Sequence, residues 1–201
     1  MSILYVLAGP NGTGKTTFYS FSVLNNFIPK DLPFINVDLI AQNLGGYNET
    51  NYERANEIYR QTISQLLSSG SDFMIESNLA DNRSYEWLKL IKKKGYKINL
   101  YYLSTDDVAI NIGRVQRRVL EGGHNIPEEI IKTRYLQSHS YLKTKLQAFE
   151  EVYLIDNSTD TSQIQVKIEN GTIVFQLAEL QNWISGIISI LERLKKSKPG
   201  F

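Results

Sequence analysis

The fold is decided by the stretch Gly9-Pro10-Asn11-Gly12-Thr13-Gly14-Lys15-Thr16-Thr17. It matches the phosphate-loop pattern G-x-x-x-x-G-K-[ST] at every fixed position. The motif follows the apolar run Ile3–Ala8 and opens a helical pattern from about Lys15 to Leu24, which is the strand–loop–helix context that this motif requires. We therefore expect residues 9–17 to bind a nucleotide.

The residue types of the motif explain its chemistry. Glycine lets backbone N–H groups curl around a phosphate without a Cβ clash, and the helix N-terminus adds positive potential. Lys15 is expected to bridge the β- and γ-phosphates, and the hydroxyl of Thr16 to ligate Mg²⁺. The motif thus predicts ATP and Mg²⁺ as cofactors. The alternative is a glycine-rich turn that binds nothing, against which the complete motif and its context argue.

Beyond the loop, short β-branched runs alternate with longer helical patterns, as in a parallel α/β fold. The pattern predicts a mostly parallel five-stranded sheet, with strands at Ile3–Ala8, Phe34–Val37, Asp72–Glu76, Ile98–Ser104 and Val152–Asp156. Helices are expected between these strands, each ending near a glycine or beginning at a capping residue.

After Ser158 the pattern changes. Residues 163–177 predict a hairpin, because Asn170-Gly171 supplies the positive φ angles of a type I′ turn. An amphipathic helix from about Ala178 to Lys196 follows. We therefore expect a core over residues 1–158 and a C-terminal hairpin and helix, residues 159–201, packed on that core.

Composition limits the class of protein. The 201 residues carry a net charge of +1, which argues against a general nucleic-acid binder, and 42% hydrophobic residues allow a sizeable core. No cysteine and only two histidines argue against thiolate chemistry and a histidine metal site. The early apolar run is too short to span a membrane and lacks a signal-peptide pattern, so a cytoplasmic location without membrane or nucleic-acid partners is expected.

Three acidic residues close predicted strands, at the edge where parallel sheets bind ligands: Asp38, Glu76 and Asp156. Asp38 is the candidate to accept the proton of a hydroxyl acceptor, with a helix cap as its alternative role. Glu76 is the next candidate for accepting that proton, and its alternative roles are substrate binding or holding a Mg²⁺-bound water. For Asp156 a turn-making role is favoured.

Arginines gather around a Gly-Gly loop. Arg114, Arg117 and Arg118 precede Gly122-Gly123-His124, and Arg134 lies on the following helix. Two arginine-bearing helices joined by such a loop predict a lid whose guanidinium groups neutralise the charge of phosphoryl transfer. The alternative is a solvated basic face. For His124 a role in packing the loop or facing solvent is favoured over its alternative role, contact with a ligand.

Several segments recur together in a known family: Gly9 to Phe18, Asn36-Val37-Asp38, Phe73 to Leu79, Arg114 to Val119, Gly122-Gly123-His124-Asn125-Ile126-Pro127-Glu128-Glu129, Arg134-Tyr135 and Tyr153 to Ser158. Over about residues 1–158 the chain resembles the zeta-toxin-like P-loop kinases, in particular a chromosomal branch with the Gly-Gly-His segment. The resemblance implies a three-layer sandwich like that of small-molecule kinases.

The resemblance also implies an activity, because the studied toxins phosphorylate a hydroxyl of UDP-N-acetylglucosamine. It makes Lys15, Asp38, Arg118 and Arg134 the expected catalytic residues. Asp38, Glu76 and Arg114 are the expected substrate contacts, and Arg114 is also a further candidate for a transition-state arginine. Ser77-Asn78 departs from the family's Thr-rich pair, and residues after about 160 match nothing in the toxin core. The resemblance therefore implies kinase activity more firmly than it implies the identity of the sugar acceptor.

We thus expect an ATP- and Mg²⁺-dependent phosphotransferase that acts on a hydroxyl of a small molecule, such as a nucleotide sugar. Two other functions stay open. One is a slow P-loop NTPase that acts as a nucleotide-gated switch through a protein partner. The other is a nucleoside or nucleotide kinase. An antitoxin-like protein is the further partner that the family suggests.

Overall fold

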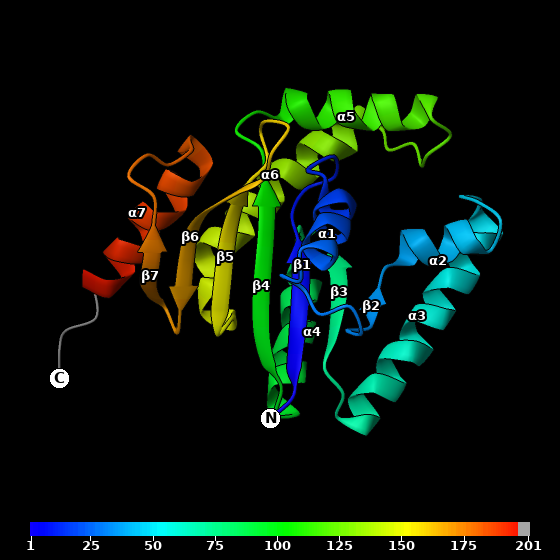
Figure 1. Cartoon of the computed structure of the whole chain (residues 1–201), viewed down its shortest axis with the longest axis horizontal. Coiled ribbons are helices and arrows are strands. Elements are labelled where there is room, and N and C mark those ends of the chain that lie inside the picture. Colours follow the sequence, from blue (N-terminus) through cyan, green and yellow to red (C-terminus); the bar gives the residue numbers. More distant parts are fainter. Residues whose placement is uncertain (197–201) are drawn as a thin grey trace.

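A single mixed sheet organises the molecule, and the computed structural model describes residues 1–196 of the chain. Its strands are β1 Ile3–Ala8, β2 Phe34–Ile35, β3 Phe73–Ser77, β4 Lys97–Ser104, β5 Glu151–Asp156, β6 Gln163–Glu169 and β7 Thr172–Gln176. They lie in the order β2-β3-β1-β4-β5-β6-β7. The strands β2, β3, β1, β4 and β5 run parallel to one another, so their carboxyl ends meet at one edge of the sheet (Figure 1).

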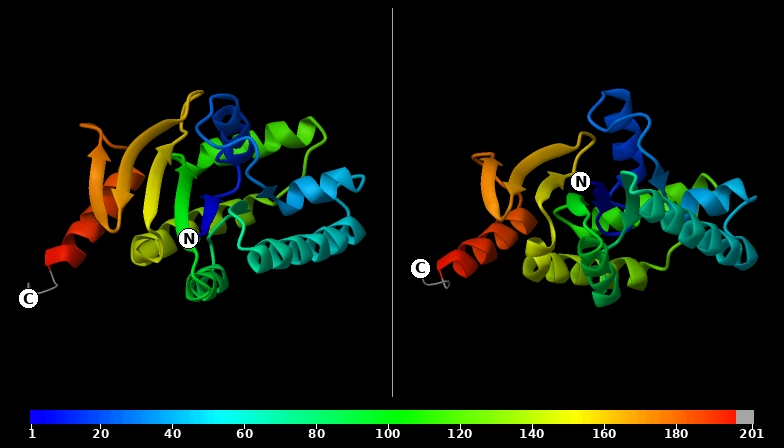
Figure 2. Two further views of the ribbon diagram at one scale, coloured as in Figure 1. Left: turned by 60° about the horizontal axis from the view of Figure 1, so that its bottom comes forward. Right: turned by 90° about the horizontal axis from the view of Figure 1, so that it is seen from below.

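Helices cover both faces of the sheet and cross its carboxyl edge. They are α1 Lys15–Leu24, α2 Val37–Asn43, α3 Glu49–Ser69, α4 Asn82–Lys93, α5 Val108–Leu120, α6 Glu128–Lys145, η1 Leu146–Ala148 and α7 Asn182–Lys196. Figure 1 shows α5 lying across the strand ends, and Figure 2 shows α1 on the opposite face of the sheet from α4 and α6. The α/β class and the three-layer arrangement are therefore as predicted.

Two apolar clusters hold these layers together. One face of β1, β3, β4 and β5 packs against α3, α4, α6 and α7, with Leu4, Phe73 and Tyr102 fully buried. The other face packs against α1 through Leu7, Phe18 and neighbours. Each fully buried aliphatic side chain contributes about 1.5–3 kcal/mol, so the sheet supplies a rigid base for the loops at its edge.

The predicted hairpin continues the sheet, which raises the strand number from five to seven. β6 pairs antiparallel with β5, and β7 with β6. Asn170 and Gly171 have φ values of 47° and 75°, in keeping with the predicted turn. Helix α7 begins at Asn182, later than the predicted Ala178, and its apolar side joins the larger core cluster. Residues 197–201, the last of the predicted C-terminal unit, lie outside the described residues.

The second predicted strand is shorter than expected. β2 contains only Phe34 and Ile35, because Asn36 caps α2 by accepting hydrogen bonds from the N–H groups of Asp38 and Leu39. Asp38 therefore lies in the first turn of a helix and does not close a strand, although it stays at the carboxyl edge. Across residues 1–196, the helices are too short or too polar to cross a bilayer.

Candidate active site

The phosphate loop has the conformation that its glycines predict. Gly12 has φ +80°, and a Cβ there would lie 2.4 Å from the carbonyl oxygen of Asn111 in α5. A Cβ on Gly9, at φ +140°, would lie 1.9 Å from the carbonyl oxygen of Leu103 at the end of β4. Both positions need glycine, because the loop passes directly over the backbone of neighbouring elements.

Asparagine side chains and one arginine fasten the loop. The side-chain amide of Asn111 donates to the carbonyl of Asn11 (2.7 Å), and that of Asn157 donates to the carbonyl of Thr13 (2.7 Å). Arg134 donates to the side-chain oxygen of Asn11 (3.0 Å). The loop shape is thus held from α5, from the loop after β5 and from α6.

Lys15 is buried, with only 5% of its surface exposed. Its ammonium group donates to the carbonyls of Gly9 (2.8 Å) and Pro10 (3.0 Å) and lies 3.6 Å from a carboxylate oxygen of Glu76. Burial lowers the pKa of Lys15, and the pairing with Glu76 opposes part of that effect. These contacts therefore hold the Lys15 ammonium group in a fixed position beside the phosphate loop.

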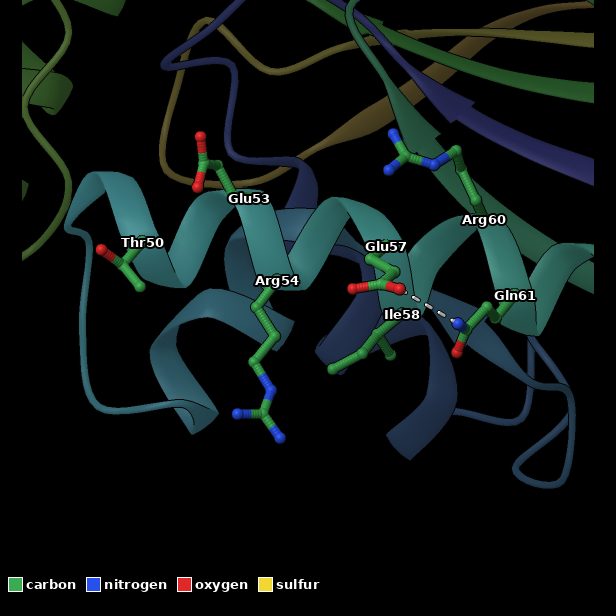
Figure 3. Close-up of a pocket in the computed structure, with 7 residues that line it drawn as sticks. All are labelled: Thr50, Glu53, Arg54, Glu57, Ile58, Arg60 and Gln61. Atoms are coloured by element: carbon green, nitrogen blue, oxygen red, sulfur yellow. Dashed lines mark hydrogen bonds between the residues drawn. The ribbon is translucent and has the colours of Figure 1, made fainter.

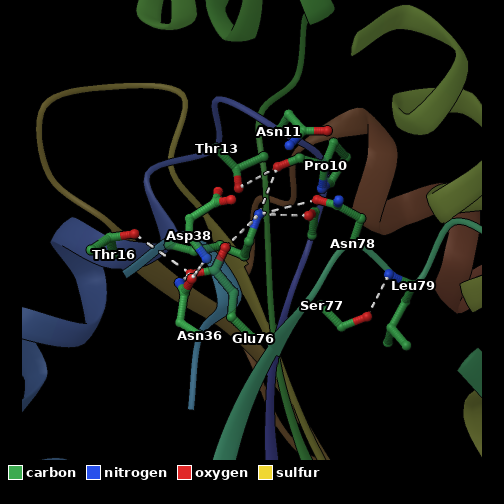
Figure 4. A network of polar contacts seen from close by, with 12 residues as sticks. Pro10, Asn11, Thr13, Thr16, Asn36, Asp38, Glu76, Ser77, Asn78 and Leu79 are labelled. Atoms are coloured by element: carbon green, nitrogen blue, oxygen red, sulfur yellow. Dashed lines mark hydrogen bonds and ion pairs between the residues drawn. The ribbon is translucent and has the colours of Figure 1, made fainter. Parts of the chain in front are cut away.

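Glu76 joins the loop to the start of α2. Its Oε2 accepts a 2.6 Å hydrogen bond from the side-chain amide of Asn36 and a 3.5 Å hydrogen bond from the hydroxyl of Thr16. Figure 4 shows the side chains of Thr16, Asn36 and Glu76 converging. Asn36, which also caps α2, thereby couples the position of Asp38 to that of Glu76.

A cleft of about 540 Å³ runs over this centre. It brings together the loop, both carboxylates and two of the arginines, and its lining residues are Asn11, Gly12, Gly14, Lys15, Thr16, Thr17, Phe18, Phe21, Asp38, Glu76, Arg114, Val115, Arg118, Glu121, Asn157, Thr159, Asp160, Thr161 and Ser162. Of the predicted site residues, Gly9, Pro10, Thr13 and Arg134 are outside this lining. Gly9, Pro10 and Thr13 are part of the loop itself, and Arg134 reaches it through Asn11.

The predicted arginines differ in what they contact. Arg114 donates to the carbonyls of Asn157 (2.7 Å) and Thr159 (3.0 Å), so it holds the loop after β5. Arg118 donates to the carbonyl of His124 (2.8 Å), while its buried Nε has no partner within residues 1–196. Arg117 is exposed on the outer side of α5. Of these three arginines, Arg114 and Arg118 line the cleft.

Asp156 is the last residue of β5 and forms a turn, and both features were predicted from the sequence. Its carboxylate accepts from the backbone N–H (3.2 Å) and hydroxyl (2.7 Å) of Ser158. It also accepts from the indole N–H of Trp183 in α7, a contact that no sequence pattern indicates. Asp156 is buried and does not line the cleft.

Among the side chains of this site that no sequence pattern singled out are Asn36, Asn111, Tyr52 and Asn157. Asn36 had a usable signal, because asparagine is a preferred helix cap and stands two residues before Asp38. Asn111, fully buried inside α5, and Tyr52, which donates to Asp38 (2.8 Å), had none.

A second hollow lies along the outer side of α3 (Figure 3). Its lining residues all belong to that helix: Thr50, Glu53, Arg54, Glu57, Ile58, Arg60 and Gln61. A hydrogen bond from Gln61 to Glu57 (3.4 Å) lies along it. Because it gathers no residue from the strand ends or the phosphate loop, it is a surface feature and not the candidate active site.

Fold and site together define a P-loop α/β protein of the kinase-like type. The zeta toxin family model matches residues 2–176, so the chain belongs to the zeta toxin family. An uncharacterized protein of Haemophilus influenzae strain Rd is 32% identical over 127 residues, which covers 63% of this chain and 88% of that protein.

Solved structures share the fold at low identity. The ATP-bound AvrRxo1-ORF1:-ORF2 structure superimposes with a TM-score of 0.68 at 15% identity, and the alignment covers 95% of this chain and 64% of that longer chain. The PezAT chromosomal toxin–antitoxin system of Streptococcus pneumoniae gives a TM-score of 0.56 at 17% identity, with 98% and 87% covered.

Proposed function

We propose that this protein is an ATP- and Mg²⁺-dependent phosphotransferase that moves the γ-phosphate to a hydroxyl of a small molecule, such as the nucleotide sugar UDP-N-acetylglucosamine. One observation carries the proposal: Lys15 and Thr16 of the phosphate loop line the same cleft as Asp38 and Arg118. A phosphate loop, a carboxylate and a guanidinium group in one cleft are components of phosphoryl transfer.

Residues 9–17 bind the nucleotide in this proposal. Backbone N–H groups of the loop and the N-terminus of α1 face the phosphates, and Lys15 bridges the β- and γ-phosphates. The fold shared with the ATP-bound AvrRxo1-ORF1:-ORF2 structure supports this role. Binding requires the Lys15 ammonium to exchange its contacts with the Gly9 and Pro10 carbonyls for phosphate oxygens.

The donors at the loop fit a magnesium ion. The hydroxyl of Thr16 and the carboxylate of Glu76 lie 3.5 Å apart, and oxygen atoms of this kind are the ligands that Mg²⁺ prefers. Residues 1–196 hold no closed cluster of three acidic or histidine ligands. This suits an ion that keeps waters and phosphate oxygens in its shell, and when bound it neutralises charge on the phosphates.

Asp38 and the arginines act on the transferred group. Asp38 accepts the proton of the acceptor hydroxyl, and Arg118 neutralises charge on the equatorial oxygens of the phosphoryl group. Arg134, which donates to Asn11 of the loop, assists Arg118 in this proposal. Glu76 and Arg114, which line the cleft, are the proposed substrate contacts.

The acceptor is proposed from the family to which the chain belongs. Purified protein is incubated with Mg-ATP and a panel of nucleotide sugars, sugars and nucleosides, and the products are separated and weighed by mass spectrometry. The proposal predicts that UDP-N-acetylglucosamine or a related nucleotide sugar gains one phosphoryl group. A product formed only from nucleosides supports a nucleoside kinase, and ATP hydrolysis without any phosphorylated acceptor supports a nucleotide-gated switch.

An antitoxin-like partner is part of the proposal. Its support is the structural likeness to a component of the PezAT toxin–antitoxin system. Expression in a bacterial host should slow growth with the wild-type protein and not with Lys15→Ala, because only the first transfers phosphate. Equal growth with both would contradict a toxic activity and remove the reason for an antitoxin.

A further inference from the structure

Three polar side chains form a chain from the lid loop, residues 121–127 between α5 and α6, to the proposed base. The hydroxyl of Tyr52 in α3 donates a 2.8 Å hydrogen bond to Oδ1 of Asp38. The same hydroxyl is hydrogen-bonded to Nδ1 of His124 in the lid loop. That nitrogen lies 3.7 Å from Oδ1 of Asp38. Elements that are distant in the sequence thus meet at one carboxylate.

The donor and the acceptor of each of these hydrogen bonds follow from the number of protons available. A phenol has one proton, and since Tyr52 donates it to the carboxylate, its oxygen can only accept from His124. His124 must therefore carry a proton on Nδ1. Burial, and after it the hydrogen bond to Asp38, raise the pKa of Tyr52, so the phenol stays protonated at neutral pH.

This arrangement leaves one oxygen of Asp38 for chemistry. Oδ1 is engaged by Tyr52, whereas Oδ2 has no hydrogen-bond partner within residues 1–196. The Asp38 side chain is 42% exposed and lines the cleft. A carboxylate held through one oxygen presents the other in a defined direction, which is what a base needs toward an acceptor hydroxyl.

The lid loop also holds Arg118. The carbonyl of His124 accepts a 2.8 Å hydrogen bond from Arg118, and a Cβ on Gly123 would lie 2.5 Å from Cγ of Arg118. The ring of Tyr47 lies 5.4 Å from that of His124 and packs the loop against the α2–α3 connection. The position of the lid loop therefore fixes the side-chain positions of both Arg118 and Asp38.

We propose that Tyr52 and His124 are positioning residues, which orient Oδ2 of Asp38 toward the acceptor when the lid loop lies against α3. The inference rests on the proposed function. In the step that it serves, the acceptor oxygen bonds to the γ-phosphorus. The bond from that phosphorus to ADP breaks with its electron pair on ADP, and the acceptor proton goes to Oδ2 of Asp38. Tyr52 keeps its own proton.

A double-mutant cycle tests the role through Asp38. Tyr52→Phe is measured alone and in the Asp38→Asn background, with ATP, Mg²⁺ and UDP-N-acetylglucosamine. Tyr59→Phe, two turns further along α3 and away from the cleft, is the matched control. We expect Tyr52→Phe to lower kcat by about 10- to 100-fold with KM for ATP unchanged, and to add nothing to Asp38→Asn. Tyr59→Phe should keep wild-type turnover.

The outcomes separate the two proposals. Unchanged kcat in Tyr52→Phe, or a loss that adds fully to that of Asp38→Asn, overturns the positioning role while wild-type transfer upholds the proposed function. No transfer by the wild type to any acceptor overturns the proposed function itself.

Nitrogen NMR of the His124 ring gives a readout that is independent of activity. The inference predicts a proton on Nδ1 in the wild type, and a shift of that proton toward Nε2 in Tyr52→Phe. A ring with Nδ1 unprotonated, or one that does not respond to Tyr52→Phe, overturns the inference even when transfer is intact.

Discussion

The indole N–H of Trp183 donates a 3.1 Å hydrogen bond to Oδ1 of Asp156, which joins α7 to the carboxyl end of β5. That oxygen also accepts from Ser158, whose hydroxyl oxygen accepts from the N–H of Asp106 (2.8 Å). The intervening Asn157 reaches the phosphate loop at Thr13. The C-terminal helix therefore supports the loop that borders the cleft, although it contributes no residue to the cleft lining.

Trp183→Phe should weaken this support. The phenyl ring that replaces the indole is smaller and has no N–H, so packing is lost and buried Asp156 loses a donor, which together cost at least about 1–3 kcal/mol. We expect the free energy of unfolding in urea to fall by this amount and ATP affinity to fall several-fold. Trp87→Phe in α4 is the control that changes stability without changing affinity. Identical ATP affinity in Trp183→Phe and the wild type would refute the link between α7 and the site.

His139 should make stability depend on pH. Its ring stacks on Trp183, with centroids 5.5 Å apart, and its Nε2 is hydrogen-bonded to the hydroxyl of Ser104 (2.7 Å). Burial, with a smaller effect of Lys143, lowers its pKa from 6.5 to about 4. The unfolded chain therefore binds the proton first, and the contribution of neutral His139 to stability is complete above pH 6.5 and is lost as the pH falls toward 4.

Urea unfolding at several pH values measures this effect. Between pH 6.5 and 4 the residue should lower the free energy of unfolding by up to about 1.4 kcal/mol per pH unit. His139→Phe keeps a stacked ring and should remove this part of the slope, whereas His124→Gln should retain it. A slope in His139→Phe equal to that of the wild type would rule out a neutral buried histidine as its source.

Lys15→Ala should abolish transfer without unfolding the protein. The lost contact acts on the β- and γ-phosphates, and removal of one such charge-stabilising group lowers kcat by about 100- to 1,000-fold or more. Circular dichroism and thermal unfolding serve as checks that the fold is intact. Turnover at the wild-type rate would show that the phosphate loop is not the catalytic site.

Asp38→Asn should separate binding from chemistry. Because the cap of α2 is Asn36, the substitution leaves the helix intact. ATP affinity, measured by calorimetry, should stay within about twofold, while transfer falls by about 100- to 10,000-fold, the range for loss of a general base. Asn36→Ala, which removes the cap and a hydrogen bond to Glu76, should instead lower stability. Parallel losses of binding and transfer in Asp38→Asn would make Asp38 a structural residue.

Gly12→Ala should distort the loop, because its Cβ meets the backbone of Asn111 and its φ is +80°. We expect loss of ATP binding and a stability decrease of about 1–3 kcal/mol. The matched variant is Gly113→Ala, where the added Cβ meets no atom within 4 Å in an exposed part of α5. That change should raise stability by up to about 1 kcal/mol. Similar behaviour of the two variants would argue against the close passage of the loop over α5.

Local patterns were sufficient to predict most of the fold. The phosphate loop, the helix Lys15–Leu24 and the Asn170-Gly171 turn each depend on neighbouring residues and were predicted at the observed positions. Asp38 was predicted to end a strand because Phe34, Ile35 and Val37, on both sides of Asn36, are strand-forming residues. In the structure Asn36 caps helix α2, which begins at Val37, so the strand ends before Asp38.

Contacts between distant residues were not predictable from the sequence. The pairing of β6 with β5, the hydrogen bond from Trp183 to Asp156, and the meeting of Tyr52 with His124 all depend on the packed sheet. No periodicity marks a buried polar side chain such as Asn111 inside an amphipathic helix. Carboxylates at the sheet edge were predictable because parallel topology alone brings strand ends together.

Phosphorus NMR of the purified protein with ATP, Mg²⁺ and UDP-N-acetylglucosamine distinguishes a phosphotransferase from a simple ATPase. A phosphotransferase gives a new sugar-phosphate resonance that grows in step with ADP and is absent with Lys15→Ala and Asp38→Asn. ADP accompanied only by inorganic phosphate, at a rate that the sugar nucleotide does not change, would contradict phosphotransfer to this nucleotide sugar.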